Sequence, residues 1–307
     1  MQPHSYDVVI VGGGAAGLSA ALVLGRARRR VAVLDAGAPR NAPAAHMQGF
    51  LSRDGLPPAE LLAIGRAEVT GYGVELIDDA VIALEPGFVV RLASGGTLHA
   101  RRLLVTTGVG DELPAIAGVR ERWGRDLLHC PYCHGWEVRD EPLGVLGTHP
   151  GAVMHAHLVR QWSDDVVFFP HTMTLSAGDR AQLDARGIRV VDGEVVGLVV
   201  DDDRLRGVAL ADGSVVARAA VFVRPRNAPH PDGLLAGLRV ETDADGLALV
   251  DRDGRTGTAG VCAAGNIVDP RASVIAAAGA ASTAAMSINA DLVAEDMARA
   301  RPERGRA

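Results

Sequence analysis

The amino-acid sequence predicts an α/β protein with two Rossmann-like, three-layer nucleotide-binding domains. Two strand–turn–helix patterns carry this prediction, one starting at Tyr6 and the other at Leu143. Each places an apolar strand directly before a glycine-containing turn and a helix of mostly small apolar residues, as a βαβ unit does. With 307 residues, 48% of them hydrophobic, the chain is long enough to fill two cores.

The first pattern occupies the N-terminal 35 residues. We expect a strand at Tyr6–Val11, a glycine-rich turn at 12–17, a helix at Ala15–Arg26 and a second strand at Val31–Leu34. The second strand ends at Asp35, an acidic residue about 20 positions after the glycines. This is the arrangement of a dinucleotide-binding unit.

The second pattern follows in the middle of the chain. It predicts a strand at Leu143–Leu146, a turn at 147–151, a helix at Ala152–Trp162 and a strand at Val166–Phe169. Between the two patterns, Leu103–Val105 is a further apolar strand. Two such starts in one chain predict two nucleotide-domain-like folds.

Turn-rich segments separate these regions. Gly110–Gly118 and Arg224–Gly233 are rich in glycine, proline and polar residues, so each is predicted to be a hinge. After the second hinge, Val261–Ala264 is predicted as a strand, and a helix of small residues is predicted from about 272 to 299.

Composition excludes several classes of protein. The formal net charge of −6 argues against a nucleic-acid binder, which would show a basic stripe. No apolar run reaches the roughly 18 residues that a membrane span needs. The N-terminus shows no signal-peptide pattern. We therefore predict a cytoplasmic protein with no membrane span.

The first candidate site is the motif Gly12-x-Gly14-x-x-Gly17. The first glycine permits a tight turn, the second lets the backbone approach a pyrophosphate, and the third allows close helix–strand packing. The helix N-terminus would stabilise the phosphate charge, and Asp35 would accept a hydrogen bond from a ribose hydroxyl. These features predict a bound dinucleotide.

The second candidate site is the run His129-Cys130-Pro131-Tyr132-Cys133-His134. A C-x-x-C pair in a cytosolic chain is typical of redox chemistry, and a helix N-terminus would lower a thiol pKa. A structural zinc half-site and c-type haem attachment remain as alternatives. Because the chain has no second C-x-x-C and no signal peptide, we favour the redox interpretation and predict no metal.

The order of these motifs resembles the low-molecular-weight thioredoxin reductase family over essentially the whole chain. The run Cys133-His134-Gly135-Trp136-Glu137 is more similar to one branch of it, the flavin-dependent dithiol oxidases such as those that close the disulfides of gliotoxin and holomycin. Thioredoxin reductases carry C-A-T-C-D-G at this place.

The resemblance implies an FAD domain that is split by an inserted NADPH-like domain. The expected boundaries are 1–113 and 229–307 for the FAD domain and 114–228 for the inserted domain with the C-x-x-C. It also implies non-covalent FAD and a homodimer. The residues that it assigns to the FAD site, including those of the first motif, are Gly12, Gly14, Ala15, Ala16, Gly17, Asp35, Ala36, Arg40, Asn41, Thr107, Gly108, Gly265, Asn266, Ser273 and Val274.

The second glycine turn departs from the family pattern. His149 replaces the glycine that gives the pyrophosphate room, and Pro150 removes a backbone N–H donor. The arginine run that binds the 2′-phosphate in NADPH-dependent members is missing, because no arginine follows Phe169 until Arg180. We therefore do not expect NADPH to bind. The family's Gly-Asp near the flavin is Gly265-Asn266 here.

By this resemblance, Cys130 would form the mixed disulfide with substrate, Cys133 would face the flavin, and His134 would act as a base. The predicted function is oxidation of a dithiol in a small molecule or a thioredoxin-like protein, with O₂ as the acceptor. A disulfide reductase fed by NAD(P)H or another donor is one alternative, and a non-catalytic FAD redox sensor is the other. His134 could also serve only in local packing.

Overall fold

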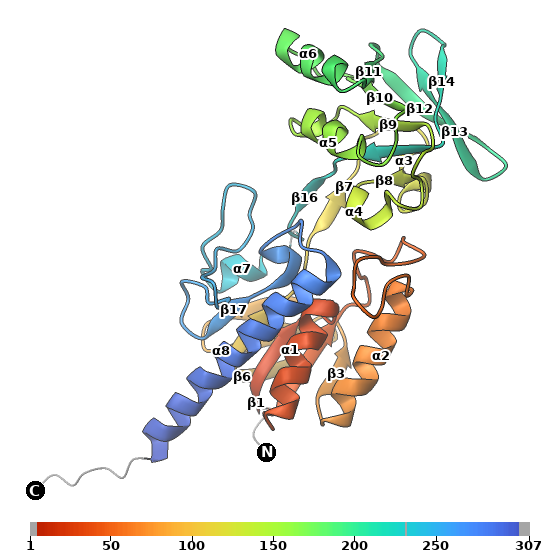
Figure 1. Ribbon diagram of the computed structural model, residues 1–307. Helices are drawn as coiled ribbons and strands as arrows, with labels where there is room; N and C mark the ends of the chain where they lie inside the picture. Colours follow the sequence, from red (N-terminus) through yellow and green to blue (C-terminus); the bar gives the residue numbers. More distant parts are fainter. Residues whose placement is uncertain (1–4, 231, 301–307) are drawn as a thin grey trace, which may run out of the picture. The chain divides into compact units, whose positions relative to one another are not determined.

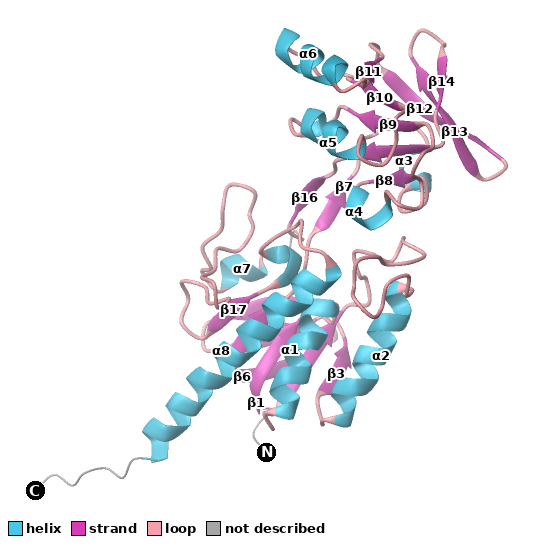
Figure 2. Cartoon of the chain, viewed as in Figure 1, coloured by secondary structure: helices cyan, strands magenta, loops and turns pink. Residues whose placement is uncertain are grey.

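The structure is a computed structural model that describes residues 5–230 and 232–300. Its contacts divide the chain into two compact units. The first unit contains residues 1–40, 58–110 and 227–307, and the second contains residues 41–57 and 111–226. Figures 1 and 2 show the elements of both units along the chain.

The first unit is built on a seven-stranded sheet. Five strands are parallel, and two more extend the sheet on the β6 side in antiparallel pairs. The parallel strands are β3 (Glu75–Asp78), β2 (Val31–Asp35), β1 (Ser5–Val11), β6 (Thr97–Val105) and β17 (Val261–Ala263), and the antiparallel pair is β5 (Val89–Leu92) and β4 (Val81–Glu85).

The parallel strands carry apolar side chains on both faces of the sheet. Val8, Ile10 and Leu104 pack in one core with helices α1 (Ala15–Arg26) and α8 (Val274–Ala300), near α2 (Pro58–Gly71). Their neighbours in sequence point to a second core on the opposite face, which includes β4, β5 and the short helix α7 (Leu234–Gly237). A sheet buried on both faces makes the three layers that the sequence predicts.

The second unit repeats this plan. Its sheet is parallel throughout, in the order β11 (Arg189–Val190), β10 (Val166–Phe169), β9 (Leu143–Leu146), β15 (Ala220–Val223) and β8 (Leu127–Leu128). Helices α5 (Ala152–Val159) and α6 (Ala177–Ala185) cover one face. The other face carries the antiparallel strands β12 (Val195–Asp201), β13 (Arg204–Leu210) and β14 (Val215–Ala217).

Short elements complete the two units. Helices α3 (Val119–Arg122) and α4 (Pro131–His134) lie in the second unit, and the 3-10 turn η1 (Gly265–Ile267) follows β17 in the first. The chain passes between the units at both ends of residues 41–57 and again at β7 (Gly110–Glu112) and β16 (Arg226–Ala228), two strands that pair with each other. Within the described residues, no helix has both the length and the apolar character for crossing a membrane.

The structure confirms the predicted α/β fold with two parallel sheets. The predicted hinges contain the paired strands β7 and β16, and the helix predicted at 152–162 ends at Val159. The units divide after Gly110 and Arg226, a few residues before the expected boundaries. The sequence did not predict that residues 41–57 would group with the second unit.

Candidate functional site

The first glycine turn is shaped by close backbone contacts. Gly12 has a φ of +109°, and a Cβ there would lie 2.4 Å from the carbonyl oxygen of Thr106. A Cβ at Gly17 would lie 1.9 Å from the carbonyl oxygen of Gly12. The buried Thr106 hydroxyl lies 3.0 and 2.9 Å from the carbonyl oxygens of Val11 and Gly12, which share its one proton. The turn is therefore held tightly against the loop that follows β6.

Gly14 differs from the other glycines of the motif. A Cβ built there would meet nothing within 4 Å, and its backbone is extended, with φ −72° and ψ −173°. It is the N-cap of α1 but provides no side-chain cap for the first-turn N–H groups. Open space in front of uncapped N–H donors fits a bound pyrophosphate. These residues therefore fit the FAD that the motif predicts.

Asp35 lies directly against this turn. A Cβ at Gly13 would come within 2.7 Å of the Asp35 side chain, so the glycine between the motif positions is also needed. The Arg66 guanidinium of α2 forms ion pairs with Asp35, at 3.2 Å, and with Asp78. Sequence analysis missed Gly13, Thr106 and Arg66, because their roles depend on which loops fold next to the turn.

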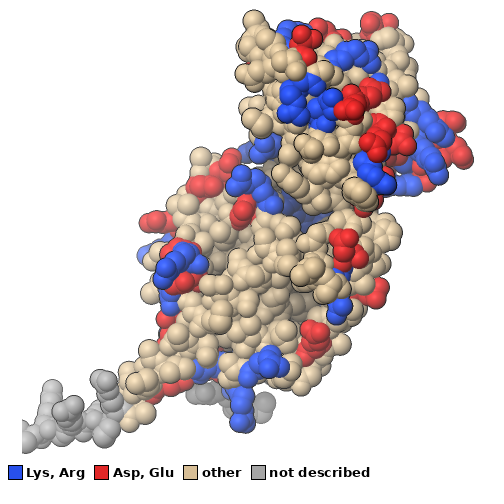
Figure 3. Space-filling view, viewed as in Figure 1, with Lys and Arg blue, Asp and Glu red and all other residues tan. Residues whose placement is uncertain are grey.

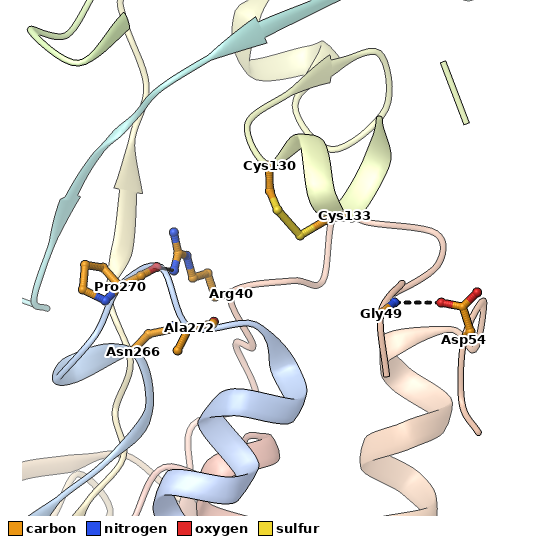
Figure 4. Close-up of a disulfide and its surroundings, with 8 residues drawn as sticks. All are labelled: Arg40, Gly49, Asp54, Cys130, Cys133, Asn266, Pro270 and Ala272. Carbon is orange, nitrogen blue, oxygen red and sulfur yellow. Dashed lines mark hydrogen bonds between the residues drawn. A yellow bond between two sulfur atoms is a disulfide. The ribbon is translucent and has the colours of Figure 1, made fainter. Parts of the chain in front are cut away.

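The loop before α8 is held by side chains predicted for the flavin site. Arg40 donates to the carbonyl oxygen of Pro270 at 2.7 Å (Figure 4). The amide nitrogen of Asn266 donates to the carbonyl oxygens of Asp269 and Ala272 at 2.9 and 3.0 Å. An aspartate, as in the family pattern, could not donate either bond when ionised. The asparagine therefore stabilises the loop that leads into α8.

Most of the other predicted flavin-site residues lie at the carboxyl ends of strands in the first sheet or next to the loop before α8. Gly265, with a φ of +78°, packs so closely on α1 that a Cβ would lie 2.9 Å from the Cβ of Ala16. Asn41 instead groups with the second unit. The remaining residues lie where their elements begin or end: Ala15 in the first turn of α1, Ala36 after β2, Thr107 and Gly108 after β6, and Ser273 and Val274 at the start of α8. Their contacts with FAD stay predictions.

Replacing Gly14 with valine should remove FAD without unfolding the protein. Its extended backbone accepts a branched residue, and the side chain would fill the open space in front of α1. We expect FAD content after purification to fall at least tenfold, measured by flavin absorbance against protein. Gly71→Val is the control, because a Cβ at Gly71 also meets nothing within 4 Å. Stoichiometric FAD in the Gly14→Val variant would contradict this placement.

The two cysteines of the second motif form a disulfide at the start of α4 (Figure 4). Cys130 is the N-cap, Pro131 is the first helical residue, and the backbone N–H groups of Cys133 and His134 donate to the carbonyl oxygen of Cys130. Both cysteines are half-buried and belong to the second unit. Cys262 is a buried free thiol, and burial raises its pKa to about 12.

His134 follows the disulfide on the same short helix. Burial lowers the pKa of its imidazole below the usual 6.5, and the nearby Glu137 carboxylate opposes this shift only in part. The imidazole is therefore neutral at pH 7 and can accept a proton. This electrostatic setting suits the predicted base.

The second glycine turn is closed by its own side chains. The Nδ1 atom of His149 accepts a hydrogen bond from the backbone N–H of Gly151 at 2.9 Å. Pro150, between them, has no N–H to offer. A Cβ at Gly151 would lie 2.5 Å from the Arg224 guanidinium. The turn that would cradle a pyrophosphate therefore uses one N–H internally and lacks another.

Within the part of the chain that the structure describes, the segment after β10 offers no unpaired arginine where the family pattern binds a 2′-phosphate. His171 stands there with a φ of +55°, and its Nδ1 accepts from the backbone N–H of Val195 at 3.0 Å. Arg180, the first arginine after the strand, pairs with the Asp192 carboxylate at 2.6 Å. Both side chains are therefore bonded to other residues of the second unit.

Comparisons with known proteins agree with this architecture. The pyridine nucleotide-disulphide oxidoreductase family matches residues 6–285. The crystal structure of HlmI aligns with a TM-score of 0.94 and 60% identity, covering 96% of this chain and 95% of that one. Thioredoxin reductase sirT from Leptosphaeria maculans is 30% identical over 96% of this chain and 97% of its own length. A probable thioredoxin reductase from Arthroderma benhamiae is 34% identical over 176 residues, and the match spans only 44% of that protein.

Two dinucleotide-type units, a C-x-x-C disulfide and these matches together define a flavin-dependent disulfide oxidoreductase. The chain belongs to the pyridine nucleotide-disulphide oxidoreductase family, whose members bind FAD. This result confirms the resemblance drawn from the motifs.

Proposed function

We propose that this chain is a dithiol oxidase, which closes a disulfide in its substrate and takes no electrons from NADPH. The observation that carries this proposal is the contrast between the two glycine turns. The first leaves open space in front of α1, whereas in the second His149 occupies the N–H of Gly151. Among the described residues, the first turn and the redox disulfide support FAD-linked thiol chemistry, whereas the second turn has one N–H used by His149 and one removed by Pro150, which disfavours a nicotinamide dinucleotide.

The Gly12–Gly17 turn and the N-terminus of α1 would hold the FAD pyrophosphate, and Asp35 would hold the adenosine ribose. When bound there, FAD would supply two-electron redox chemistry between the enzyme dithiol and O₂, with H₂O₂ as the product. The overall balance is R(SH)₂ + O₂ → R(S–S) + H₂O₂. No nicotinamide enters this balance.

The exchange itself takes place on the Cys130–Cys133 disulfide. A substrate thiolate attacks the sulfur of Cys130 and breaks the disulfide, which releases Cys133 as a thiolate. The second substrate thiol then attacks the mixed disulfide, releasing Cys130 and the oxidised substrate. Two electrons pass from the substrate to the two cysteines. The substrate's two protons reach the released thiols or a nearby base, for which we propose His134.

The proposed role of His134 predicts a pH profile. A base must be neutral to accept a proton, so activity should fall as the pH drops through its pKa. Because burial lowers this pKa, the acid limb of kcat/KM should lie below pH 6.5. His134→Asn should lose this limb and slow turnover by about a hundredfold, in the range for a general base. A limb that persists in His134→Asn would assign it to another group.

A direct test of the proposed function is anaerobic titration with dithiothreitol. The first equivalent of dithiothreitol per subunit should reduce the enzyme disulfide. The second equivalent should bleach the flavin, without any added nicotinamide. The names of the thioredoxin reductase relatives favour a second candidate, an NAD(P)H-fed disulfide reductase. That function requires NADPH to bleach the flavin instead.

We also propose a homodimer. Met286, Val293 and Met297 are exposed along α8 at spacings of seven and four residues, which puts them on one side of the helix. Figure 3 shows few charged side chains over α1 and α8. Sedimentation of the purified protein should give twice the subunit mass, and Val293→Glu should shift it toward the monomer. A monomeric wild-type protein would contradict this.

A further inference from the structure

Two exposed aromatic side chains flank the redox disulfide. Aromatic residues make up only 4% of the chain. Of those that the structure describes, three are exposed, and two of these are Tyr132 and Trp136, with 73% and 66% of their surfaces accessible. Tyr132 lies between the two cysteines, and Trp136 lies three residues after Cys133. Two of the three exposed aromatic side chains of the described residues therefore lie within three residues of the redox cysteines.

Each of these two aromatic side chains packs against a neighbouring side chain. The Tyr132 ring meets Trp162 edge to face, with centroids 5.6 Å apart. A Cβ at Gly135 would lie 2.8 Å from the Trp162 ring, so α4 and the turn after it pack closely on that ring. The Arg139 guanidinium lies 4.0 Å from the centroid of Trp136 and donates to its carbonyl oxygen at 2.6 Å. Both aromatics are supported on one side yet remain mostly exposed.

The size of this surface favours a small ligand. Two aromatic side chains offer about 300–500 Å² when fully covered. A stable protein partner needs about 800 Å² from each side. Three charged residues of the turn after α4, Glu137, Arg139 and Asp140, are also exposed. A small molecule can cover the two aromatic rings and leave these charges in water, whereas a protein would have to bury them.

We propose that Tyr132 and Trp136 are specificity-determining residues, which bind the apolar ring of a small dithiol substrate while its thiols reach Cys130. This inference deepens the proposed function and rests on it. The two rings offer stacking or edge-to-face contacts to a planar group. They form no bond with the substrate and exchange no electrons, so they change which dithiol is oxidised and leave the chemistry as written above.

Two dithiols of matched chemistry test the proposal. Dithiothreitol and 1,2-bis(mercaptomethyl)benzene both close to a six-membered cyclic disulfide, but only the second carries an aromatic ring. The measurement is the ratio of their kcat/KM values, aromatic over dithiothreitol, in the FAD-loaded enzyme. Trp136→Ala and Tyr132→Ala should each lower this ratio about tenfold, equivalent to 1.4 kcal/mol. Trp136→Phe and Tyr132→Phe should keep most of it, because a ring remains.

Tyr72→Ala is the matched control, since Tyr72 is the other exposed aromatic and lies on the first unit, next to α2. It should leave the ratio unchanged. An unchanged ratio in both alanine variants, with dithiothreitol still oxidised, would overturn this inference and leave the proposed function standing. A wild-type enzyme that oxidises neither dithiol would overturn both. Equal losses for both dithiols would show that the aromatics only support the disulfide and would also overturn the inference.

Discussion

Replacing either Cys130 or Cys133 with serine should abolish dithiol turnover, with a loss of at least a thousandfold. Either change removes the exchangeable disulfide, and a serine hydroxyl cannot replace a thiolate as nucleophile or leaving group. Steady-state O₂ consumption with dithiothreitol measures this loss. Cys262→Ala is the control, because its buried thiol, with a pKa near 12, takes no part in exchange and should leave turnover within about twofold.

The same two variants assign the cysteines. We propose that Cys133 is the cysteine that reacts with the flavin, so Cys130→Ser should leave its thiolate free and show long-wavelength charge-transfer absorption. Cys133→Ser should lack this band. The reverse pattern would exchange the two roles, and substantial turnover in either variant would contradict exchange through this disulfide.

NADPH should reduce the bound flavin at least a hundredfold more slowly than a dithiol does. The absent arginine cluster removes a charge-assisted contact worth about 1.5–3 kcal/mol. The turn at 147–151 adds a second loss, because His149 holds the N–H of Gly151 and Pro150 has none. Each 1.4 kcal/mol weakens binding tenfold. Stopped-flow absorbance of the flavin under anaerobic conditions, at equal concentrations of each reductant, measures the ratio.

NADH separates the two causes of this loss. The missing arginine contact affects only the 2′-phosphate, whereas the closed turn weakens both nucleotides. We therefore expect NADH to be as ineffective as NADPH. Rapid bleaching by NADH alone would show that the turn still binds pyrophosphate, and rapid stoichiometric bleaching by NADPH would support the reductase instead.

Much of the fold could be predicted from the sequence. Apolar strands next to glycine turns gave helix α1 and strands β9 and β10 with the bounds that the structure has. The antiparallel strands β12, β13 and β14 were missed. Residues 41–57 carry no strand or helix, so no periodicity could show which unit they join.

The candidate site was predictable where a motif fixes local backbone and not where distant segments meet. The spacing of Gly12, Gly14 and Gly17 predicts the turn, but Arg66 reaches Asp35 from another helix. His149 is a further example. The sequence indicates that a side chain replaces a glycine, and only the structure shows that its Nδ1 accepts the N–H of Gly151.

Product stoichiometry in air, without any nicotinamide, tests the dithiol oxidase activity directly. The enzyme should convert dithiothreitol to its cyclic disulfide over many turnovers, with one H₂O₂ formed for each disulfide. Catalase in a parallel sample should remove the peroxide signal and leave disulfide formation unchanged. Failure to form disulfide without NADPH, together with NADPH-dependent reduction of an added disulfide, would show a disulfide reductase instead of a dithiol oxidase.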